Sequence, residues 1–135
     1  MSIETRQYSP TEGADAGKIF EIAQMPAMKL ERFALRIIHA VLKARPDLPK
    51  ELIAGGASAL KELGIGAILS IAPDDAEPIL AEMLTYVQFV DAANPNVKRK
   101  LFEADIESVS TLLAIRMQWF DLNLGFLMAA KAPTM

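Results

Sequence analysis

Apolar residues recur at helical spacing in three segments of the chain. The clearest segment follows the i, i+3, i+4, i+7 pattern, which places its apolar side chains on one face of a helix: Leu30, Phe33, Ala34, Ile37, Ile38, Val41 and Leu42. A second helix is predicted behind Pro73, because proline and the acidic Asp74 and Asp75 favour a first helical turn. A third helix is predicted from near residue 103 to about residue 128.

Shorter segments between these helices carry other signals. Residues 18–23 (KIFEIA) predict a short strand, and residues 86–102 predict a small hairpin across the turn-rich sequence DAANPN. Residues 49–71 hold four glycines among their apolar residues, which predicts a glycine-interrupted helix pair. We therefore expect a mainly α fold, a compact bundle of four to five helices, with a short N-terminal strand and a small β-hairpin near 86–102 as optional additions. Residues 1–17 are expected to be a flexible arm, 18–128 a single helical domain, and 129–135 a flexible tail.

The last predicted helix is apolar around most of its circumference. Ile106, Val109, Leu113, Phe120, Leu124 and Leu127 share one broad side, whereas a second side carries Leu112, Ile115, Trp119, Leu122 and Phe126. A chain with four or five helices can hardly bury such a helix completely. We therefore predict self-association, and we predict that the second side contacts a partner.

Composition and charge exclude several classes of function. The chain has 135 residues, no cysteine, one histidine and a formal net charge of −3. Such a chain forms one domain without disulfides, thiolate zinc sites or a histidine-rich metal centre. The acidic balance argues against nucleic-acid binding. The most apolar stretch, residues 52–72, has Lys61 and Glu62 at its middle, which argues against a membrane span, and no signal peptide is recognisable.

The polar side chains offer a surface and no catalytic constellation. On the helix over 30–42, the face opposite the apolar stripe is basic: Lys29, Arg32, Arg36, His39 and Lys43. We predict that Lys29, Arg32, Arg36 and Lys43 steer acidic partners, with an ordinary solvated face as the alternative. The acidic clusters after Pro73 and after Phe102 are explained by helix capping. No nucleophile elbow or phosphate-binding loop is present, so we expect no enzymatic activity, cofactor or metal.

Three stretches of the sequence carry a resemblance to a known family. They are KIFEIAQMPAMKLERFALRIIHAVL (18–42), DDAEPILAEMLTYVQFV (74–90) and FEADIESVSTLLAIRMQWFDLNLGF (102–126). Their order, over residues 18–128, resembles the small tail assembly chaperones of long-tailed bacteriophages and prophages. None of the three stretches is a catalytic signature.

The resemblance implies a mostly helical, non-enzymatic protein that coats the tape-measure protein and recruits tail-tube subunits. Such a protein works in the cytoplasm of an infected or lysogenic bacterial host and is absent from the mature virion. Two alternatives stay open. One is another small helical phage adaptor, such as a head–tail connector. The other is a ligand-binding domain or enzyme built on the glycine-rich middle and the aromatics around Trp119, which predicts a deep pocket with convergent polar groups.

Overall fold

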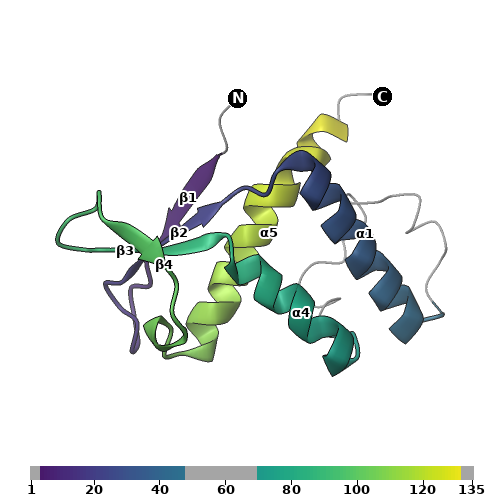
Figure 1. Ribbon diagram of the computed structural model, residues 1–135, viewed down its shortest axis with the longest axis horizontal. Helices are drawn as coiled ribbons and strands as arrows, with labels where there is room; N and C mark the ends of the chain where they lie inside the picture. The colour runs from purple at the N-terminus through teal and green to yellow at the C-terminus, as the bar shows by residue number, and fades with distance from the viewer. Residues whose placement is uncertain (1–3, 48–69, 132–135) are drawn as a thin grey trace.

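The computed structural model describes residues 4–47 and 70–131, with the side chains of residues 125–131 excepted. Four antiparallel strands form one sheet in the order β1-β2-β3-β4: β1 (Thr5–Tyr8), β2 (Ile19–Ala23), β3 (Val87–Val90) and β4 (Lys98–Lys100). The described helices are α1 (Ala27–Ala44), α4 (Pro73–Leu84), the 3-10 helix η1 (Glu103–Asp105) and α5 (Val109–Lys131). Helix α5 crosses the centre of the molecule, with the sheet on one side and α1 and α4 on the other (Figure 1).

The prediction of a mainly α bundle is wrong. The described residues form an α+β fold with a four-stranded sheet and three α-helices. The strand at 18–23 and the hairpin at 86–102 are both confirmed, but they pair with each other in register from Ile19↔Val90 to Ile22↔Val87. This pairing joins segments that lie far apart in the chain, and the periodicity of a local stretch of sequence therefore does not predict it.

The N-terminal residues also differ from the flexible arm that their polar composition predicts. Strand β1 pairs along its whole length with β2, from Thr5↔Ala23 to Tyr8↔Phe20. The loop between the two strands turns at Gly13 and Gly17, whose φ angles of 81° and 85° suit glycine. Asp15 in this loop is fully buried. A polar edge strand with a structured loop therefore occupies most of the segment.

The predicted helices are confirmed where they are described. Helix α1 buries all but one residue of the predicted apolar stripe, and Leu42 is half-buried. Helix α4 begins at Pro73 as expected. The last helix starts later than predicted, because residues 103–105 form a 3-10 turn before α5 begins at Val109. Helix α5 continues to Lys131, into the segment for which we predicted a flexible tail. The glycine-rich pair predicted over 49–71 falls almost wholly outside the described residues.

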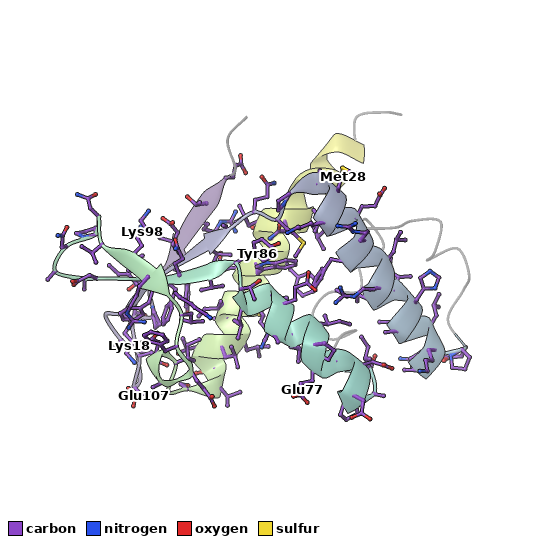
Figure 2. The ribbon with its side chains drawn as sticks, in the orientation of Figure 1. Lys18, Met28, Glu77, Tyr86, Lys98 and Glu107 are labelled. Carbon is purple, nitrogen blue, oxygen red and sulfur yellow. The ribbon has the colours of Figure 1, made fainter. Side chains whose placement is uncertain are left out.

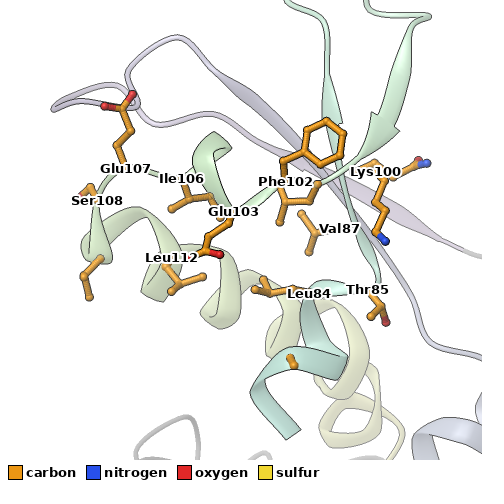
Figure 3. A pocket seen from close by; sticks show the side chains of 14 residues that line it. Leu84, Thr85, Val87, Lys100, Phe102, Glu103, Ile106, Glu107, Ser108 and Leu112 are labelled. Atoms are coloured by element: carbon orange, nitrogen blue, oxygen red, sulfur yellow. The ribbon is translucent and has the colours of Figure 1, made fainter. Parts of the chain in front are cut away.

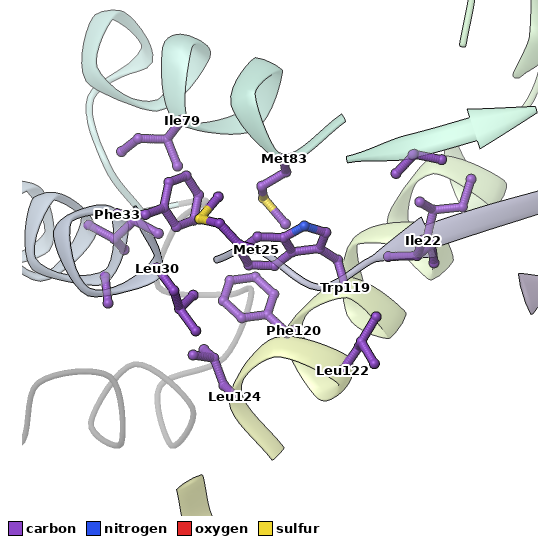
Figure 4. Close-up of a cluster of buried hydrophobic side chains, with 14 of the residues drawn as sticks. Ile22, Met25, Leu30, Phe33, Ile79, Met83, Trp119, Phe120, Leu122 and Leu124 are labelled. Atoms are coloured by element: carbon purple, nitrogen blue, oxygen red, sulfur yellow. The ribbon is translucent and has the colours of Figure 1, made fainter. Parts of the chain in front are cut away.

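The core lies where α5 meets α1, α4 and the sheet. Trp119 is its largest member, and its ring packs against Phe33 of α1 and Phe120, with centroids 5.2 and 5.6 Å away (Figure 4). Phe20 and Ile22 bring the sheet into the same cluster. Buried Asn123 fixes the chain between β2 and α1, since its Oδ1 accepts the Met25 N–H at 2.7 Å. One hydrophobic core therefore holds the sheet and the helices together.

Candidate docking groove

An apolar groove of about 840 Å³ lies at one corner of the fold (Figure 3). It is bounded by the C-terminal end of α4, the β3–β4 edge of the sheet, the connection through η1 and the first turns of α5. Its apolar lining residues are Ala81, Leu84, Val87, Leu101, Phe102, Ile106, Val109 and Leu112. A groove of this size and character suits apolar side chains of a ligand or of a partner protein.

Arg99 holds the wall of the groove that carries Phe102. Its guanidinium lies between two aromatic rings, 4.6 Å from the centroid of Phe89 and 4.5 Å from that of Phe102. The same group donates to both carboxylate oxygens of Asp105 at 2.8 Å, and Asp105 in turn accepts the N–H of Phe102 at 2.7 Å. The Arg99 hydrogen bonds hold the pKa of Asp105 below its usual range. Phe102 is therefore positioned by a charged network.

Asp15 fixes the opposite wall, at the start of α5. Its carboxylate accepts the N–H groups of Glu107 and Ser108, each at 3.0 Å, and so caps the approach to the helix. The ammonium of Lys18 donates to Asp15 at 2.8 Å, to the carbonyl of Asp105 at 3.0 Å and to Glu107 at 3.1 Å (Figure 2). The Lys18 ammonium and these amides hold the pKa of Asp15 well below its usual range. The loop before β2 thus anchors the entrance of α5.

Three charged side chains line the groove, Lys100, Glu103 and Glu107, and Glu107 pairs with Lys18 at 3.1 Å. Glu103 reaches over the middle of the groove near Leu112, whereas the ammonium of Lys100 lies at the other end beside Thr85 (Figure 3). Neither forms an ion pair within the described residues, where the ion pairs of β4 belong to Lys98 and Arg99. Among the described residues, the groove therefore presents one unpaired negative charge over its middle and one unpaired positive charge at the end beside Thr85.

A row of exposed apolar side chains on α5 adjoins the groove. Val109 is 81% exposed, Leu113 39% and Met117 56%, at intervals of four residues along the helix. Phe102, on the facing wall, is 56% exposed. We call Val109, Leu113 and Met117 the α5 ridge. Several exposed apolar side chains grouped beside a groove are typical of a protein-binding site.

The side of α5 that we predicted to contact a partner lies mostly in the core. Ile115, Trp119 and Leu122 are at most 6% exposed, so they stabilise the fold and have no surface to offer. Leu112 is half-buried and lines the groove, whereas the Phe126 side chain lies outside the described residues. Self-association stays a prediction, and α5 up to Leu124 exposes fewer of its apolar side chains than the sequence indicates.

The basic face of α1 is only partly free. Arg36 pairs with Glu82 at 2.9 Å and Lys43 with Asp75 at 3.6 Å, so two of its cations join α1 to α4. Lys29 and Arg32 are exposed and make no ion pair with another described residue. The four cations therefore divide between a structural contact and a solvated surface, and none of them lines the groove.

The chemistry available in the groove favours binding. Its hydroxyl groups belong to Thr85, which donates to the Glu82 carbonyl at 2.6 Å, and to Ser108. His39 is exposed on α1 and does not line it. In the described part of the chain, no three histidine or acidic side chains gather to hold a metal ion, and no helix there is long and apolar enough to cross a bilayer.

Comparisons with protein-family models, with curated proteins and with solved structures find no match to this chain.

Proposed function

We propose that the protein is a tail assembly chaperone of a long-tailed phage or prophage, which binds the tape-measure protein and helps tail-tube subunits to assemble. The observation that carries the binding role is the groove with its adjoining ridge, because both expose apolar side chains that a folded monomer ordinarily covers. The class of partner comes from the sequence resemblance over residues 18–128.

The proposed mechanism is the covering of apolar surface. A long partner with apolar faces aggregates unless those faces are covered, and a groove that accepts apolar side chains provides such cover. The contact must be reversible, because the protein proposed here acts in the host cytoplasm and leaves before the virion is complete.

Co-expression tests the proposal. The proposal predicts that a gene next to this one encodes a very long tape-measure protein, which is expressed in bacteria with or without this chain. We expect the long protein to be insoluble alone and to remain soluble, and to co-purify, when this chain is present. No change in its solubility would contradict the proposal. Finding this chain as a permanent component of purified particles would favour a head–tail connector instead.

A further inference from the structure

We infer that the groove receives a short amphipathic helix of the partner, with a basic residue beside Glu103 and an acidic residue beside Lys100. The inference rests on the proposed function for the identity of the partner. It adds the conformation of the bound segment and the direction in which that segment lies.

The apolar floor of the groove favours an apolar face on the partner helix that it binds. Leu84, Val87 and Leu112 form the floor together with Leu101 and Ile106. A charged group placed on such a floor would lose its hydration without gaining a partner. The side chains of Glu103 and Lys100 lie apart along the groove, one near Leu112 and one beside Thr85, where a bound segment would place its polar edges (Figure 3).

The ridge favours a helical partner over an extended one. Val109, Leu113 and Met117 repeat at i, i+4 and i+8, which at 1.5 Å per residue gives a row of about 12 Å. Side chains in i, i+4 rows pack into the matching grooves of another helix. Two to three turns of a partner helix match this length. An extended segment would instead pair with the open edge of β4, where the exposed Lys98 and Lys100 discourage strand addition.

The two free charges select one direction for that helix. They carry opposite signs and lie at separate places along the groove, so a segment with complementary charges meets both only when it runs one way. Reversing the helix would bring like charges together at both positions. Charge complementarity thus sets orientation, while the apolar floor provides most of the attraction.

Photo-crosslinking in the co-expressed complex tests where and how the partner binds. A photoreactive phenylalanine analogue replaces Phe102, which is 56% exposed at the groove, or Met28, which is 80% exposed on α1. Figure 2 shows Met28 at the opposite corner of the molecule from Glu107, which also lines the groove. We expect crosslinks to the long protein from position 102 and none from position 28. The crosslinked segment, identified by mass spectrometry, should have apolar residues at i, i+3 or i+4, and i+7.

Other crosslinking outcomes overturn the inference. Crosslinks from position 28 alone would place the partner on α1. Crosslinks between two copies of this chain would make the groove a self-association surface, and a segment with alternating apolar residues would mean strand addition. Failure of the wild-type chain to keep the long protein soluble would instead contradict the proposed function itself, so the two failures are distinguishable.

Charge reversal tests the direction. Glu103→Lys and Lys100→Glu should each weaken retention of the partner by about two- to fivefold, because each places a like charge beside the bound helix. The double exchange should restore most of the retention, because the same helix lying in the reverse direction is then complementary at both positions. Glu77→Lys is the control, because Glu77 is exposed on α4 and does not line the groove. A double exchange that retains the partner no better than either single variant would contradict the assignment of direction to these two charges.

Discussion

Ile115 offers the sharpest test of which side of α5 is core. It is fully buried, although the sequence alone places it on a partner-binding side. Ile115→Ala removes three buried carbon atoms, worth about 0.8 kcal/mol each, and the cavity left behind raises the cost to about 3 kcal/mol. Leu113→Ala, on the exposed ridge of the same helix, should cost less than about 1 kcal/mol.

Urea unfolding measures both costs, with the single tryptophan of the chain as the reporter. Trp119 is 1% exposed, so its emission shifts when the core opens. With a slope of about 2 kcal/mol per molar urea, Ile115→Ala should lower the midpoint by about 1.5 M. The reasoning is refuted if Ile115→Ala unfolds at the wild-type midpoint while the chain loses its partner, since Ile115 would then be a surface contact.

Three further substitutions test the polar contacts that hold the fold. Asp15→Asn should reduce the loss of stability that the wild type shows in acid. The pKa of Asp15 is lowered in the folded state, so ionised Asp15 stabilises the wild type above about pH 4 and this contribution disappears as the pH falls. Urea unfolding of both proteins at pH 7 and pH 3 measures the difference. Asn123→Ala should cost about 1–3 kcal/mol in thermal or urea unfolding, because it leaves the buried Met25 N–H without its acceptor. Arg116→Met should keep the free energy of unfolding within about 1 kcal/mol of wild type or raise it, because burial lowers the pKa of this guanidinium and no described carboxylate pairs with it. A large loss of stability in urea unfolding would show that the 2.7 Å hydrogen bond from Arg116 to the Leu80 carbonyl outweighs the cost of desolvation.

The helices were predictable because their signals are local. The apolar residues from Leu30 to Val41 recur in each consecutive turn of α1, and Pro73 with two aspartates marks the start of α4. The sheet was not predictable as a sheet, because its strands are three to five residues long and its central pairing is non-local. Strand β1 (TRQY) has no apolar face from which a strand could be predicted.

The groove was hidden for a related reason. Its lining comes from the ends of several elements, so no single window of sequence contains it. In α5 the apolar residues surround the helix, and periodicity alone cannot decide whether Ile115 or Leu113 faces inward. The deciding partners are Phe33 on α1 and Phe20 on β2, which only the fold brings to that helix. The role of Asp15 could not be predicted either, because its contacts with Glu107 and Ser108 span most of the chain.

One comparison tests most directly whether the groove and ridge receive the partner. Val109→Glu and Met28→Glu each place a glutamate in the first turn of a helix at an apolar position about 80% exposed, so both should fold like wild type. The measurement is the fraction of the co-expressed long protein that stays soluble with each variant. We expect Val109→Glu to lose most of that fraction and Met28→Glu to keep it. Equal retention by the two variants would contradict the assignment of the groove and ridge as the binding site.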